Sequence, residues 1–236
     1  MDIGMLYVGT SGFAYDEWRG EFYPEGLKRD AYLEHYATRF PSVEINYTFR
    51  RFPSPKTLER WREQASDGFR FALKANQRIT HAKRLRDADE DVARFLELAR
   101  MLGEKLGPIL FQCPPNLPYD ESLLAAFLGY LPPDVQAAFE FRHPSWEEAK
   151  PLLASQGAAW VDSETDERAV HGIAPGPFAY LRLRKDDDSE PELEAWAARI
   201  AEAVGVGRDV YCFLKHEQEA FRRADRLRDL VSARVG

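Results

Sequence analysis

Residues 136–142 read Gln-Ala-Ala-Phe-Glu-Phe-Arg, a short apolar run that ends in a charged side chain. Six further runs end in a charged or amide residue, and the spacing leaves room for one helix between most neighbours. They are residues 43–46, 69–74, 108–112, 158–162, 178–182 and 209–215, and an eighth run at residues 5–8 opens into Gly9-Thr10-Ser11-Gly12. Strands that alternate with helices and have polar C-terminal ends predict a TIM-type α/β barrel with its functional groups at one rim.

Alternation along each run predicts which side chains point into the barrel, because every second residue of a strand faces the same side. Counting back by twos from the terminal polar residues gives an interior that is apolar below and ionisable above. The predicted upper layer contains Glu44, Asn46, Lys74, Gln112, Glu140, Arg142, Asp162, Arg182 and Lys215. Folding alone does not require so many charges at matching positions, since a buried unpaired charge is costly.

The chain length fits one barrel domain spanning residues 1–236, slightly below the roughly 250 residues typical of eight strand–helix units. One connection should therefore be abbreviated. Between strands 6 and 7, the Gly- and Pro-containing segment from Ser163 to Pro177 leaves no room for a full helix. The connection from Thr10 to Leu27 is long and rich in aromatic residues, and we expect it to cover the mouth. Helical spacing predicts helices at 29–40, 91–106, 121–131, 146–155, 191–204 and 217–235, with Asp120 and Ser145 as caps. A further helix is predicted to begin at Pro55, with Leu58 and Trp61 on one face.

Composition restricts the partners and the compartment. A formal charge of −7 and a pI near 5.4 argue against a broad electrostatic nucleic-acid surface, although a local basic cleft would still allow a nucleic-acid partner. Cys113 and Cys212 do not form a disulfide framework, and no apolar run approaches the ~20 residues of a membrane span. We therefore expect a cytoplasmic protein with no membrane partner. No cofactor and no oligomeric state follow from the sequence.

Several long motifs resemble one family. They are Gly9-Thr10-Ser11-Gly12-Phe13-x-Tyr15-x-x-Trp18-x-Gly20-x-Phe22-Tyr23-Pro24, Val43-Glu44-Ile45-Asn46, Phe71-Ala72-x-Lys74-Ala75, Gly107-Pro108-Ile109-Leu110-Phe111-Gln112 and Glu140-Phe141-Arg142-His143-Pro144-Ser145-Trp146. This pattern resembles domain-of-unknown-function family 72, the YecE-like proteins, along nearly the whole chain. The resemblance implies a barrel of alternating strands and helices. The chain differs from the family pattern at Arg184-Lys185 and at Lys215, where cationic side chains replace small or neutral ones.

The charged upper layer has two interpretations. In the first, Glu44, Glu140 and Asp162 form a pre-paired polar layer with the neighbouring cations and only close the barrel. In the second, Arg142 and Arg182 offer forked donors to a phosphate or carboxylate, Lys74 and Lys215 add positive charge, and the Gly9–Gly12 turn adds backbone N–H groups. The same turn could equally be a tight connection after the first strand.

Histidines and aromatic residues supply further candidates. His81, His143 and His216 follow strand ends, which suits acid–base chemistry near neutral pH, although His143 could instead hold its loop through a backbone hydrogen bond. Most aromatic residues of the first loop should seal it onto the barrel. We retain Tyr15 and Tyr47 as candidate ligand contacts.

The leading hypothesis is an enzyme, a hydrolase or a lyase, that acts on a small anionic substrate such as a phosphorylated compound. Its predicted catalytic residues are Glu44, Glu140, His143 and Asp162, and its predicted substrate-binding residues are Tyr15, Asn46, Lys74, His81, Gln112, Arg142, Arg182 and Lys215. One alternative is a metal-dependent phosphoesterase or nuclease that uses the three carboxylates, although no short metal-ligand motif is present and we assign no metal ligands. The other is a non-catalytic module that binds a ligand or nucleic acid in the same pocket.

Overall fold

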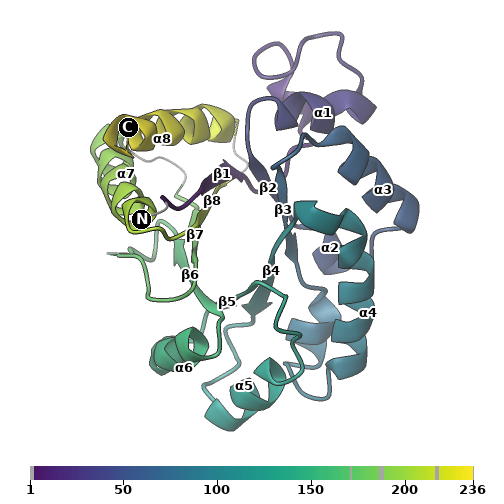
Figure 1. Ribbon diagram of the computed structural model, residues 1–236, viewed down its shortest axis with the longest axis vertical. Coiled ribbons are helices and arrows are strands. Elements are labelled where there is room, and N and C mark those ends of the chain that lie inside the picture. The colour runs from purple at the N-terminus through teal and green to yellow at the C-terminus, as the bar shows by residue number, and fades with distance from the viewer. Residues whose placement is uncertain (1–2, 171, 186–188, 216–217, 236) are drawn as a thin grey trace.

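A computed structural model describes residues 3–170, 172–185, 189–215 and 218–235. Eight parallel strands form one sheet in the order β1-β8-β7-β6-β5-β4-β3-β2, and the sheet curves into a nearly closed barrel surrounded by helices (Figure 1). The strands are β1 (Leu6–Thr10), β2 (Ser42–Ile45), β3 (Arg70–Lys74), β4 (Leu106–Cys113), β5 (Ala137–Phe141), β6 (Ala159–Glu164), β7 (Ala179–Leu183) and β8 (Val210–Leu214). The predicted TIM-type α/β barrel is confirmed.

Helices follow most strands, as the apolar spacing predicts. The α-helices are α1 (Tyr32–Ala37), α2 (Tyr47–Arg50), α3 (Pro55–Gln64), α4 (Asp89–Ala99), α5 (Glu121–Leu128), α6 (Lys150–Ser155), α7 (Glu190–Gly205) and α8 (Ala220–Val235). Short turns of other helix types are η1 (Asp16–Trp18), η2 (Arg29–Ala31), η3 (Arg78–Ala82), η4 (Arg100–Lys105) and η5 (Pro144–Ala149). The described residues between β6 and β7 contain no helix, so the abbreviated connection is confirmed.

The seam between β1 and β2 closes the barrel without a regular ladder. The two strands meet in one isolated parallel bridge between Ser11 and Glu44. Beside it the buried hydroxyl of Tyr36 accepts a hydrogen bond from Thr10 N–H at 2.8 Å and donates one to Ser42 carbonyl oxygen at 3.1 Å. Gly9 permits this close approach, because a Cβ atom there would lie 1.9 Å from Ser42 oxygen. The seam therefore places Ser11 directly beside Glu44.

Apolar side chains form two separate clusters, one outside the strand wall and one inside it. The outer cluster joins the strands to the helices. The inner cluster fills the barrel with Tyr7, Ala72, Leu110, Ala138, Ala159, Val161, Phe178, Tyr180, Tyr211 and Phe213. These residues match the predicted interior parity in every predicted strand except β6. There Ala159 and Val161 point inward, while Trp160 belongs to the outer cluster, so the parity predicted for this strand is wrong.

The first loop packs mainly beside the barrel wall. Trp18, Phe22 and Tyr23 are buried against aromatic side chains of α1 and against Phe221 of α8. Figure 1 shows the segment leading into α1 at the periphery of the barrel. The prediction that these aromatic residues seal the loop onto the barrel is confirmed. The expectation of a cover over the mouth is wrong for this part of the loop, because its apolar side chains are buried against helices.

Candidate functional site

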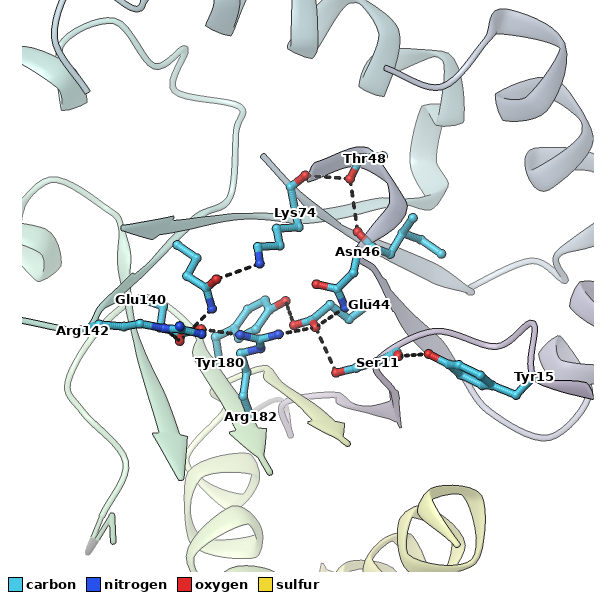
Figure 2. Close-up of polar contacts among 12 residues, drawn as sticks. Ser11, Tyr15, Glu44, Asn46, Thr48, Lys74, Glu140, Arg142, Tyr180 and Arg182 are labelled. Atoms are coloured by element: carbon cyan, nitrogen blue, oxygen red, sulfur yellow. Dashed lines mark hydrogen bonds and ion pairs between the residues drawn. The ribbon is translucent and has the colours of Figure 1, made fainter. Parts of the chain in front are cut away.

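A buried ion-pair network spans the barrel interior at the C-terminal ends of the strands. Arg182 of β7 donates to Glu44 of β2 at 2.8 Å through one terminal nitrogen and to Glu140 of β5 through the other (Figure 2). The three side chains are only 2, 0 and 3 % exposed. One guanidinium therefore holds two carboxylates from opposite parts of the wall, and strand parity explains why all three point inward.

Glu44 is saturated by neutral donors as well. Its Oε1 atom accepts from Ser11 hydroxyl and from Asn46 Nδ2, both at 2.9 Å, and its Oε2 atom accepts from Tyr180 hydroxyl at 2.9 Å. Burial opposes ionisation of this carboxyl, but Arg182 and these donors outweigh it and lower its pKa. Glu44 is thus a fixed carboxylate whose acceptor sites are already occupied.

Glu140 connects the network to Lys74 of β3. Gln112 Nε2 donates to Glu140 Oε1 at 2.8 Å, and Lys74 Nζ donates to Gln112 Oε1 at 2.7 Å. Arg142 also lies 3.4 Å from Glu140 Oε1 with its side chain 45 % exposed. Burial would raise the pKa of Glu140, but Arg182 and Arg142 hold it at about 2. Glu140 is therefore ionised at neutral pH and is poorly suited to donate a proton there.

Lys74 makes its direct side-chain contacts with uncharged groups. Its Nζ atom lies 4.1 Å from the Phe49 ring centroid, and the only acceptor recorded for it among the described residues is Gln112. Burial lowers the pKa of Lys74 to about 8, and the nearby Arg182 guanidinium acts in the same direction. Thr48 hydroxyl donates to the Lys74 carbonyl oxygen at 2.6 Å, which fixes the backbone at this strand end (Figure 2).

A cavity of about 560 Å³ opens at the mouth beside Glu140 and Arg142. Arg184 and Lys215 also line this cavity, and each follows an inward strand residue, Arg182 or Phe213, by two positions. The β6–β7 connection contributes three further charged residues to the lining, Asp166, Glu167 and Arg168. No carboxylate of the described residues lies within ion-pair distance of Arg184, whereas Lys215 has an interaction partner. Burial and Arg182 lower the pKa of Arg184, yet an arginine remains cationic.

The two described histidines that follow strand ends have different roles. His81 lies in η3, where its Nδ1 is 2.9 Å from Thr80 hydroxyl and its ring packs edge-on against Phe49 at 4.9 Å. Burial and Lys74 lower the pKa of His81. His143 precedes η5 as its cap, with Nδ1 accepting from Ser145 N–H at 3.3 Å. The backbone-hydrogen-bond alternative for His143 is thus confirmed. His216 lies outside the described residues.

Ser145 does not cap the helix that follows β5. Its hydroxyl accepts instead from Tyr119 N–H at 2.8 Å, so the predicted Ser145 cap is wrong, because the helical segment begins earlier, at Pro144. The predicted Asp120 cap is confirmed, since its carboxylate accepts from Leu123 N–H at 2.9 Å.

A second cavity of about 560 Å³ lies on the other side of the seam, between the first loop and α3. Tyr15, Asn46 and Tyr47 line it together with Arg29 and Arg60. Tyr47 is 52 % exposed, while Tyr15 donates its hydroxyl to Ser11 carbonyl oxygen at 2.7 Å. Burial and Glu44 raise the pKa of Tyr15, so this hydroxyl stays protonated at neutral pH.

Asp162 does not join the other carboxylates. The shifted parity of β6 turns its side chain to the outside of the barrel wall, where it accepts from Ala174 N–H at 2.8 Å and lines a different cavity with Lys150 and Trp160. Burial raises the pKa of Asp162 to about 6. The predicted grouping of Asp162 with Glu44 and Glu140 is therefore wrong, because β6 continues to Glu164 and Ser163 takes the inward position.

The described residues contain no group of three or more His, Cys, Asp and Glu side chains that could hold a metal ion. Glu44 and Glu140 share one arginine, which occupies the position a shared cation would take. The three-carboxylate set of the phosphoesterase alternative is not assembled in this arrangement.

Some site residues were not selected from the sequence. Ser11 and Tyr180 bind Glu44, Phe49 packs against Lys74, and Arg184 faces the mouth cavity. Counting back from Arg182 places Tyr180 inside the barrel, and extending the same parity forward reaches Arg184. Nothing local in the sequence indicates the position of Phe49, because the short helix α2 that carries it follows β2 directly.

Comparisons with known proteins agree with this architecture. The family model described as "Protein of unknown function DUF72" matches residues 7–235. The chain belongs to the DUF72 family. UPF0759 protein YecE of Escherichia coli K12 is 32 % identical over 203 residues, covering 84 % of this chain and 71 % of that protein. UPF0759 protein YunF of Bacillus subtilis is 25 % identical over 180 residues, covering 70 % of this chain and 62 % of that protein.

Solved DUF72 structures show the same fold. A crystal structure of a family member from Thermotoga maritima aligns with a TM-score of 0.85 at 25 % identity, covering 97 % of this chain and 99 % of that one. A member from Enterococcus faecalis aligns with a TM-score of 0.78 at 16 % identity, covering 97 % and 96 % of the two chains. The family identified from the motifs is therefore confirmed.

Proposed function

We propose that this barrel binds a small anionic ligand, such as a phosphorylated or carboxylated compound, at the C-terminal mouth and acts on it as an enzyme. The observation that carries the proposal is an excess of positive charge at the mouth. Glu44 and Glu140 are both bound by Arg182, whereas Lys74 and Arg184 have no ion-pair partner among the residues that the structure describes. An anion would supply the missing negative charge.

The buried cation Arg182 and the cations that line the cavity have different roles in the proposal. Arg182 is occupied inside the network, so its role in the proposal is to hold Glu44 and Glu140 rather than to contact the ligand. Arg142, Arg184 and Lys215 line the cavity and are the proposed anion clamp. Forked guanidinium groups suit phosphate and carboxylate oxygens better than a single ammonium does.

We propose that the protein acts in the cytoplasm without a membrane partner. Both cysteines are free and buried, which suits a reducing compartment. Among the described residues, no helix has the length and apolar character needed to cross a bilayer.

A thermal-shift panel tests the proposal. Phosphate, sugar phosphates, nucleotides and divalent metal ions are added separately to wild type, Arg184→Gln and the control Lys56→Gln, which removes an exposed charge on α3. A ligand at 100 times its Kd should add about 2.7 kcal/mol, or roughly 5–10 °C. We expect an anion to raise the Tm of wild type and Lys56→Gln, and to raise that of Arg184→Gln much less. Equal shifts in all three proteins would contradict the assignment.

A further inference from the structure

Lys74 is placed differently from an ordinary anion-binding lysine. It ends β3 with its side chain pointing toward Gln112 in the charged layer (Figure 2), and part of its surface remains accessible. Its nearest partners, Gln112 Oε1 and the Phe49 ring, carry no formal charge. A lysine that only neutralised the network would be expected to contact Glu140 directly, but Gln112 lies between them and donates to that carboxylate.

Charged groups from several strands surround Lys74. Burial lowers the pKa of Lys74 to about 8, and Arg182 of β7 and Arg142, which follows β5, act in the same direction. Glu44 of β2 and Glu140 of β5 oppose this shift. The pKa of His81 in η3 is lowered by burial and by the positive charge of Lys74. Desolvation and neighbouring cations are the conditions that activate a lysine amine as a nucleophile.

We propose that Lys74 forms a covalent imine with the aldehyde or ketone group of a small anionic substrate. This inference rests on the proposed function, because the cations of the mouth would bind the anionic group while Lys74 Nζ reaches the carbonyl carbon. It narrows the substrate class to oxo acids and phosphorylated aldehydes or ketones. A hydrolase or lyase with such a step would use the imine as an electron sink for bond cleavage at the adjacent carbon.

The step balances without an oxidant or a reductant. The neutral amine adds its lone pair to the carbonyl carbon, and the carbonyl oxygen takes up one proton. The carbon–oxygen bond then breaks, and the oxygen leaves as water with one proton from Nζ and one from solvent. The protonated imine carries one positive charge, which comes from the solvent proton that the reaction consumes. The neighbouring carboxylates Glu44 and Glu140 stabilise this charge.

Reductive trapping with glyoxylate tests the proposal, because glyoxylate is a small aldehyde that carries its own carboxylate. The protein is incubated at pH 7 with glyoxylate and cyanoborohydride, and the labelling rate of each lysine is measured by peptide mass spectrometry. With a pKa of about 8, roughly one Lys74 amine in ten is neutral at this pH, whereas fewer than about one in a thousand ordinary lysines is. We expect Lys74 to react at least about ten-fold faster than the exposed Lys28 and Lys56.

Further arms separate the two proposals. Inorganic phosphate should slow the labelling of Lys74 and leave that of Lys56 unchanged, and propionaldehyde, which lacks an anionic group, should label Lys74 more slowly than glyoxylate does. Lys74→Arg retains the charge and removes the amine, so it should keep the anion-induced thermal shift and lose the fast adduct.

The outcomes that would overturn the inference are distinct. Labelling of Lys74 in the wild-type protein no faster than that of Lys56 would refute the imine, and an intact thermal shift would then leave the proposed function standing. Fast labelling with no effect of phosphate and no preference for glyoxylate would refute the anionic substrate class and the proposed function together. The wild-type comparison does not depend on any variant folding.

Discussion

Replacing Arg182 by Met removes the one cation that the two buried carboxylates share. Glu44 and Glu140 are almost fully buried, so Arg182→Met leaves Glu44 without an ion-pair partner and Glu140 with only the half-exposed Arg142. Breaking a buried pair in this way typically costs about 3–5 kcal/mol at neutral pH. For a domain of this size, that loss lowers the Tm by roughly 10 °C.

The pH dependence follows from the sign of the pKa shift. The pKa of Glu140 is held at about 2, below its ordinary value of 4.5, so the folded wild type gains about 3 kcal/mol from this group above pH 5 and loses it as the pH falls toward 2. Without Arg182 the buried carboxylates should bind protons more readily. The deficit of Arg182→Met should therefore be largest at pH 7 to 8 and should shrink toward pH 4.

Urea unfolding at pH 7.5 and pH 4.5 measures this difference. The matched control is the triple variant Glu44→Gln, Glu140→Gln, Arg182→Met, which removes all three charges while keeping their approximate shapes. We expect it to recover most of the stability that the single variant loses at pH 7.5. A single variant within about 1 kcal/mol of wild type at pH 7.5, or a deficit that does not change with pH, would refute the electrostatic account.

Two further predictions concern the seam and the outward carboxylate. Tyr36→Phe should lower the free energy of unfolding in urea by about 1–3 kcal/mol, because Thr10 N–H and Ser42 carbonyl oxygen lose their buried partner. Tyr130→Phe, at an exposed site, is the control. Equal stability of the two variants would contradict a stabilising role of the Tyr36 hydroxyl at the seam. Asp162→Asn should stabilise the protein by about 1–2 kcal/mol at pH 8 and leave it nearly unchanged at pH 3, because the pKa of Asp162 is raised from 3.8 to about 6 and folding is penalised progressively as the pH rises through that range. Loss of stability at pH 8 would instead show that the Asp162 charge is well compensated.

Strand parity predicts most of the site from the sequence. It places Glu44, Lys74, Gln112, Glu140 and Arg182 in one layer, and the contacts among them confirm that placement. The parity works because those runs end where the strands become polar, so the last inward residue can be identified. A sequence pattern does not show which carboxylate each arginine contacts, since that depends on how strands far apart in the chain face one another.

The wrong parity predicted for β6 is explained by tertiary contacts on the outer side of the strand. The sequence predicts Asp162 as the inward end of its run because it is the first charged residue there, but β6 extends to Glu164. Asp162 is stabilised outside the wall by Ala174 N–H, and Glu164 by Trp196 of α7, whose indole N–H donates at 2.9 Å. Ala174 lies 12 residues after Asp162 in the β6–β7 connection, and Trp196 lies 32 residues after Glu164. Buried acidic residues on the outer side of a strand therefore resemble site residues until the tertiary contacts are known.

The most direct test of the anion site is a crystal structure of the protein with tungstate, a phosphate analogue whose anomalous scattering locates it. The account predicts a tungstate ion at the mouth, with oxygens within about 3 Å of Arg184 and of at least one of Arg142 and Lys74. Tungstate ordered only elsewhere on the protein, with the mouth empty, would contradict the central claim.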